Sequence, residues 1–70
     1  MSDYVFMQVI LHAKAPNAFK LSNPVVGSDE VWVDHIFIEA TDAMKLRSLN
    51  SGNETEIQID LNTAIGKGLL

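Results

Sequence analysis

The stretch that decides the fold lies near the start of the sequence. It reads Tyr4-Val5-Phe6-Met7-Gln8-Val9-Ile10-Leu11-His12-Ala13. The odd positions are all apolar, whereas the even positions mix aromatic, aliphatic and polar side chains. Because successive side chains of a strand point to opposite faces, this pattern predicts a strand with one core face and one mixed face. Apolar side chains on both faces exceed what one small core hides, so we expect self-association through Tyr4, Phe6 and Ile10.

Two further strands are expected after this one. Pro16-Asn17 predicts a turn or a bulge, and Phe19 and Leu21 then resume the alternation. A loop through Gly27 leads to residues 30–39, which are rich in β-branched and aromatic residues. The alternation shifts within this segment, and we interpret the shift as a β-bulge at Asp34-His35. The bulge leaves Trp32 and Phe37 on the outer side and places four aliphatic side chains in the core: Val31, Val33, Ile36 and Ile38.

The second half of the sequence predicts one short helix and one clear strand. Residues 41–50 fit either a helix, capped by Thr41 or Asp42, or one arm of a hairpin. The helical interpretation rests on apolar residues at helical intervals, namely Ala43, Met44, Leu46 and Leu49. Residues 55–61 alternate cleanly, which predicts that Ile57, Ile59 and Leu61 face inward and that Glu54, Glu56, Gln58 and Asp60 face water. A final helical turn is expected to start at Asn62.

Length and composition limit the architecture. The 70 residues suffice for a single small domain over residues 1–70, and 47% apolar residues exclude intrinsic disorder. The sequence has no cysteine, so disulfides and cysteine-based metal sites are excluded and self-association is the remaining means of stabilisation. We predict a mostly β (β-rich α+β) domain that works as a homo-oligomer. Its strands, about four in number, form a small curved antiparallel sheet or barrel with one short helix.

Three short motifs follow one another in the order Ala18-Phe19-Lys20-Leu21, Glu30-Val31-Trp32-Val33 and Ala64-Ile65-Gly66-Lys67-Gly68-Leu69. Together they resemble a pattern of small phage-type β-rich proteins of unassigned function, which reads Ala-x-x-Val, Glu-Val-Trp-Ile and Ala-x-x-Lys-Gly-Leu. The resemblance runs from Ala18 to Leu70. It departs at Asp34-His35, where the pattern has Pro-Lys, and at Asn62, where it has Trp. The resemblance implies a compact β-barrel-like module of mobile-element origin.

The charge balance narrows the choice of partners. Nine acidic residues against five basic ones give a net charge of −4, which argues against binding to duplex nucleic acid. The start, Met1-Ser2-Asp3, lacks a positive leader, and the apolar stretch over residues 4–11 is too short to span a bilayer. We therefore expect no membrane partner and a cytoplasmic location, in the host cell cytoplasm if the protein is phage-encoded.

No residue pattern predicts catalysis, a cofactor or a metal. Asp34 and His35 are neighbours on an expected strand, so their side chains point to opposite faces and cannot orient one another. His12 and His35 fit no metal-ligand spacing. An enzyme is thus the least favoured class.

Binding is the remaining class of function, and Trp32 is the centre of the predicted binding site. An exposed indole stacks a base or another flat ligand, or else packs in a subunit contact. The Gly66-Lys67-Gly68 segment is either a phosphate-binding backbone or a plain C-terminal turn. The predicted ligand-binding residues are Trp32, Lys20, Arg47, Lys67 and His35.

These features favour a non-catalytic phage or mobile-element binding module. In the first hypothesis it sequesters a nucleotide-like or other small anionic ligand, such as a host defence signal. In the alternative it is a protein-binding inhibitor, of an anti-defence or DNA-mimic type, that blocks a host protein. The alternative rests on an acidic and aromatic surface, since eight of the nine acids lie between Asp29 and Asp60.

Overall fold

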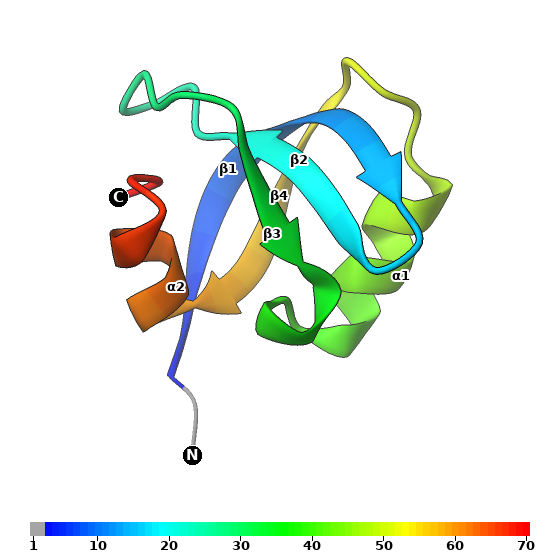
Figure 1. Cartoon of the computed structure of the whole chain (residues 1–70). Helices are drawn as coiled ribbons and strands as arrows, with labels where there is room; N and C mark the ends of the chain where they lie inside the picture. The colour runs from blue at the N-terminus through cyan, green and yellow to red at the C-terminus, as the bar shows by residue number, and fades with distance from the viewer. Residues whose placement is uncertain (1–2) are drawn as a thin grey trace.

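A computed structural model describes residues 3–70, which form one antiparallel sheet with the strand order β3-β2-β1-β4 (Figure 1). The strands are β1 (Tyr4–Ala15), β2 (Ala18–Ser22), β3 (Val31–Asp34) and β4 (Glu54–Asp60). A 3₁₀-helix, η1 (His35–Phe37), and two α-helices, α1 (Ala40–Ser48) and α2 (Leu61–Gly66), complete the described chain. The mostly β fold class and the curved four-stranded sheet are confirmed, and the sheet is open. Met1 and Ser2, which bear on the expected lack of a leader, lie outside the described residues.

The long strand β1 holds the sheet together because it has two different partners. Its first part, Tyr4–Ile10, pairs with β4, and its second part, Ile10–Ala15, pairs with β2. The register with β2 shifts between Leu11 and Ala13, which leaves His12 as an extra residue. Such a bulge bends a strand and increases its twist, so β1 curves around the core. Pro16-Asn17 forms the turn into β2, as predicted.

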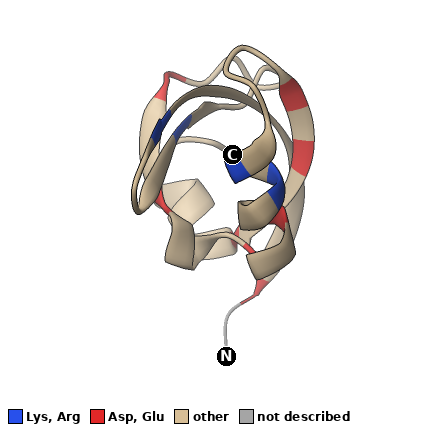
Figure 2. Cartoon of the chain, turned by 90° about the vertical axis from the view of Figure 1, so that its right-hand side faces the viewer, with Lys and Arg blue, Asp and Glu red and all other residues tan. Residues whose placement is uncertain are grey.

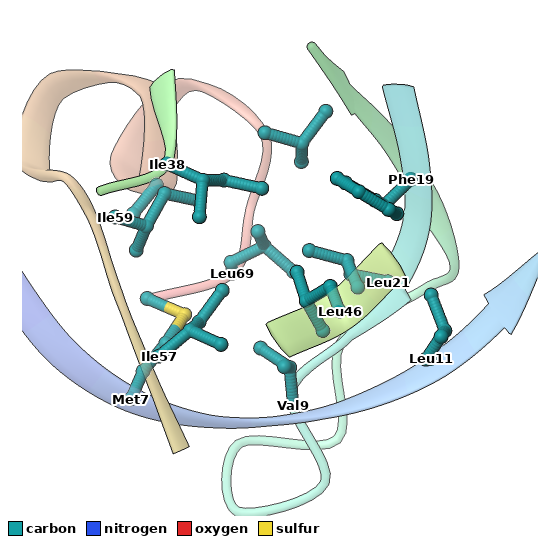
Figure 3. Close-up of a cluster of buried hydrophobic side chains, with 12 residues drawn as sticks. Met7, Val9, Leu11, Phe19, Leu21, Ile38, Leu46, Ile57, Ile59 and Leu69 are labelled. Carbon is teal, nitrogen blue, oxygen red and sulfur yellow. The ribbon is translucent and has the colours of Figure 1, made fainter. Parts of the chain in front are cut away.

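The core lies on the concave side of the sheet (Figure 3). As predicted, Val5, Met7, Val9 and Leu11 of β1 and the aliphatic residues of β4 point toward it. The bulge at His12 reverses the alternation, so the expected inward position of Ala13 is wrong: Ala13 pairs with Lys20 on the outer face, and Lys14 pairs with the buried Phe19. Leu46 of α1, Ala64 of α2 and the following Leu69 are fully buried in the same cluster, so both helices pack on this side. The buried hydrophobic residues are Met7, Val9, Leu11, Phe19, Leu21, Val33, Ile38, Leu46, Ile57, Ile59, Ala64 and Leu69.

The predicted strand over residues 30–39 is wrong in its second half. β3 ends at Asp34, whose Oδ1 accepts a hydrogen bond from the Ile36 N–H at 3.0 Å and thereby starts η1. Ile36 is consequently 65% exposed instead of in the core. Ile38 is buried as expected and forms an isolated bridge with Ile59 of β4. An aspartate that caps a tight turn, rather than a bulge, accounts for the shifted alternation.

Residues 41–50 contain a helix and not a hairpin arm. Its cap is Glu39, two residues before the expected Thr41, and the Glu39 carboxylate accepts hydrogen bonds from the backbone N–H groups of Thr41 and Asp42 at 2.9 and 3.3 Å. Of the four apolar residues on which the helical interpretation rests, Leu46 is buried, whereas Met44 is 72% exposed and does not face the core.

The last helix begins earlier than predicted. Asp60, rather than Asn62, is the cap, since its Oδ2 accepts a hydrogen bond from the Thr63 N–H at 2.9 Å. Leu61, expected as the last residue of the strand, is the first residue of α2. The carboxylate therefore ends β4 and starts α2 at the same residue.

Candidate binding surface

The outer face of the sheet is the surface opposite the core and the two helices. The even-numbered residues of β4 and those of β1 before its bulge, residues 4–10, point to this face, as do Lys20 and Trp32. Phe6 is 67% exposed, and Tyr4 and Trp32 are each 44% exposed. The acidic residues Glu54, Glu56 and Asp60 of β4 lie opposite Ile10, Gln8 and Tyr4 of β1 and thus on the same face. Red acidic positions outnumber blue basic positions along the chain in Figure 2.

Trp32 lies beside a small polar network on this face. It is paired in register with Lys20 of β2. The Lys20 Nζ lies 3.6 Å from Glu30 Oε1, and the other Glu30 oxygen lies 3.8 Å from His12 Nδ1. His12 Nε2 in turn forms a 2.7 Å hydrogen bond with Ser22 Oγ. The positive charge of Lys20 is thus partly neutralised where it adjoins the indole ring.

Arg47, a predicted ligand-binding residue, lies on the other side of the sheet. Its guanidinium donates hydrogen bonds to the backbone carbonyls of Ala15 at 2.7 Å and of Pro16 at 3.1 Å. The same group lies over the Phe19 ring, 4.4 Å from its centroid. The structure therefore places Arg47 against the β1–β2 turn and away from Trp32.

Lys67 and its neighbouring glycines form the C-terminal cap of α2. The N–H groups of Lys67, Gly68 and Leu69 donate to the carbonyls of Thr63, Ile65 and Ala64 at 2.9, 3.1 and 2.9 Å. Gly68 has a φ of 77°, which is the left-handed conformation typical of this cap. Because these N–H groups are already bonded, the segment fits the plain C-terminal turn better than a phosphate-binding backbone.

Of the five predicted residues, the structure brings Trp32 and Lys20 together. His35 is exposed in η1, directly after β3, and its backbone N–H donates to the Asn17 carbonyl at 2.8 Å. Residues 3–70 contain no pocket and no group of three or more metal-ligating side chains.

Sequence reasoning missed the edge of β3. His35 donates to Asn17, and Val33 and Val31 pair with β2, so the backbone groups of these odd residues point toward β2. The N–H and C=O of Trp32 must then point away from the sheet, and within the described chain nothing bonds to them. The carboxylates of Glu30 and Asp34 are exposed on either side of Trp32. The acid-x-Trp-x-acid spacing was visible in the sequence, whereas the open edge was not.

Comparisons with protein-family models, curated proteins and solved structures give no match. Among the helices of residues 3–70, none has the length and apolar character needed to cross a membrane.

Proposed function

We propose that the protein is a non-catalytic binding module that captures an extended, basic segment of a partner protein along β3. The observation that supports this proposal is the combination of an open strand edge, a half-exposed Trp32 and two flanking carboxylates, Glu30 and Asp34. Asp34 is the stronger of the two for a basic partner, since the charge of Glu30 is partly offset by Lys20 at 3.6 Å. Edge strands bind extended peptides because the two backbones exchange hydrogen bonds and alternate side chains supply specificity.

The spacing defines the partner's chemistry. Side chains at alternate positions of an added strand lie directly opposite residues 30, 32 and 34, so the complementary pattern is basic-x-apolar-x-basic. A lysine or arginine near the indole also gains a cation–π interaction. Each cross-strand pair contributes roughly 0.2–1 kcal/mol. The net charge of −4 further attracts a basic segment and speeds its association.

The same geometry gives less support to a small anionic ligand. Lys20 is paired with Glu30, and Arg47 is bonded to main-chain carbonyls. The resemblance to phage-type proteins suggests that the partner is a host protein, which would make the module a protein-binding inhibitor. The adjacency of Trp32 and Lys20 remains the feature that a nucleotide-like ligand would use, so the test includes such ligands.

The single tryptophan makes the test direct, since its fluorescence reports on Trp32 alone. The probes are a blocked Lys-Thr-Val-Thr-Lys peptide, its Glu-Thr-Val-Thr-Glu counterpart, adenosine monophosphate and a cyclic dinucleotide. We expect the basic peptide alone to change the fluorescence, with an affinity that falls as salt is added. Equal binding of both peptides, or binding of a nucleotide without either peptide, would contradict the proposal.

A matched pair of variants locates the site by calorimetry. Asp34→Asn removes a carboxylate beside Trp32 while keeping the oxygen that caps η1, and Glu54→Gln makes the same change in charge on β4 at the other edge of the sheet. We expect Asp34→Asn to weaken peptide binding by up to about fivefold, which corresponds to one cross-strand pair. Glu54→Gln should bind nearly as well as the wild type. If Glu54→Gln weakened peptide binding more than Asp34→Asn did, the site would lie on β4 and the proposal would be wrong.

A further inference from the structure

The first half of β1 has a strand neighbour on one side only. β4 pairs with Tyr4–Ile10, but the register with β2 starts at Ile10. Within residues 3–70, no strand pairs with the other edge of Tyr4–Gln8. The exposed side chains of Tyr4 and Phe6 belong to this same segment.

Hydrogen bonds on β4 show which way the backbone of this segment points. Gln58, the register partner of Phe6, uses its N–H to bond Asp42 Oδ2 at 2.8 Å and its carbonyl to accept from the Glu39 N–H at 2.9 Å. Both Gln58 groups therefore point away from β1, so Phe6 and Gln58 are a pair without mutual hydrogen bonds. By alternation, the N–H and C=O groups of Tyr4, Phe6 and Gln8 face the open edge.

The outer edge of β4 is closed by comparison. Besides the bonds from Glu39 and Asp42, the Lys45 Nζ donates to the Glu56 carbonyl. These groups of Glu39 and α1 occupy the positions that another strand would use. Of the strand edges in the described chain, the open ones are β3 and the first half of β1.

We propose that a second copy of this chain pairs with this edge, β1 against β1, as an antiparallel dimer. A two-fold axis at Phe6 places Phe6 opposite Phe6 of the second copy, and Tyr4 opposite its Gln8. All the edge N–H and C=O groups of these residues then have partners. The two Phe6 rings meet on the outer face, which buries the most exposed aromatic side chain of the protein.

Charge favours a second copy at this edge. Residues 4–8 carry no charge, and the nearest acids on β4 are Glu56, opposite Gln8, and Asp60, opposite Tyr4. In the dimer, Glu56 of one copy and Asp60 of the other are three strand spacings apart, about 14 Å, and thus beyond the ~8 Å screening length of physiological salt.

Self-pairing along β3 is disfavoured for the same electrostatic reason. Centred on Trp32, it would place Glu30 directly opposite Asp34 of the second copy, and like charges in that position repel. The charges therefore assign the edge of β1 to a second copy and leave the edge of β3 for a basic partner.

Light scattering after size exclusion at micromolar concentration tests this dimer. The wild type should have the mass of two chains, and Phe6→Lys should have the mass of one while keeping the wild-type circular dichroism spectrum. The matched control is Met44→Lys, which adds the same charge at a 72% exposed position on α1 and should stay dimeric. A monomeric wild type, or a dimer that survives Phe6→Lys and dissociates in Met44→Lys, would overturn the proposal.

A second variant tests the backbone pairing itself. Gln8→Pro removes an N–H from the open edge without removing a hydrogen bond of the β1–β4 ladder. We expect a folded monomer, and a folded dimer would contradict pairing at this edge. Monomeric Phe6→Lys should still bind the basic peptide, because β3 is not part of the contact, so failure of the dimer and failure of the proposed function are distinguishable.

Discussion

Arg47 ties α1 to the turn between β1 and β2. Its guanidinium bonds the carbonyls of Ala15 and Pro16 and lies over Phe19, while its own carbonyl accepts a hydrogen bond from Lys14 Nζ at 2.8 Å. Arg47 thus donates hydrogen bonds to the β1–β2 turn and accepts one from β1, and these bonds join residues more than thirty positions apart in the sequence. Arg47, which is predicted from the sequence to bind a ligand, therefore stabilises the fold through its hydrogen bonds.

This arrangement predicts a loss of stability in Arg47→Ala. Loss of the cation–π contact and of two charge-assisted hydrogen bonds at a partly exposed site should lower the free energy of unfolding by about 1–2 kcal/mol. Arg47→Lys should recover only part of this, because an ammonium lacks the planar fork that reaches both carbonyls. Urea unfolding followed by circular dichroism measures the effect, with Lys67→Ala as the control. An Arg47→Ala midpoint equal to the wild-type midpoint would show that the contacts contribute nothing.

At the scale of elements, α1 protects the sheet as well as covering the core. Its cap and its first turn both bond the outer edge of β4, since the Glu39 N–H donates to the Gln58 carbonyl and Asp42 accepts from the Gln58 N–H. Asp42 Oδ1 also lies 3.5 Å from Lys45 Nζ, which itself bonds the same edge. Glu39 and α1 therefore close an edge that would otherwise attract another strand.

We predict that Asp42→Ala destabilises the protein and that Asp42→Asn largely does not. Alanine leaves the partly buried Gln58 N–H without its acceptor, which should cost about 1–3 kcal/mol of unfolding free energy. Asparagine keeps an oxygen in place and should lose less than half as much. Urea unfolding gives both free energies, and hydrogen exchange of the Gln58 amide should be faster in Asp42→Ala alone. Equal losses in the two variants would mean that the charge, rather than the hydrogen bond, matters.

For the whole molecule, small size limits the stability that one core can supply. A chain of 70 residues buries about 60% of its unfolded surface and is only marginally stable by itself. The proposed dimer would hide Phe6 and satisfy the edge of β1, while the edge of β3 stays open in each copy. Assembly and partner binding would then use separate edges of one sheet.

The dimer predicts a melting temperature that rises with protein concentration. By mass action, each tenfold increase in concentration favours the folded dimer by about 1.4 kcal/mol. Wild type should therefore melt a few degrees higher at each step, whereas Phe6→Lys should melt at one temperature throughout. Scanning calorimetry over a hundredfold range of concentration is the measurement. A wild-type melting temperature that does not vary would argue for a monomer.

The sequence alone predicts which residues of a strand face the core where apolar and polar residues alternate regularly. The alternation in β1 and β4 predicts the inward residues Val9, Leu11, Ile57 and Ile59, because a shift by one residue would expose all of them. It also predicts the mostly β class, the turn at Pro16-Asn17 and the outer position of Trp32. These features are determined by residues close together in the sequence, so a local pattern of residue types is enough to predict them.

Tertiary structure decided the rest, because it depends on which distant groups meet. Asp34 caps a 3₁₀ turn where the pattern predicts a continuing strand with a bulge, and Glu39 caps α1 two residues before the predicted Thr41. Arg47 donates to carbonyls of the β1–β2 turn, which is more than thirty residues away in the sequence. Above all, strand register determines which backbone groups remain free. The open edges of β1 and β3 follow from where β2 ends and from what α1 covers, and side-chain periodicity carries no record of either.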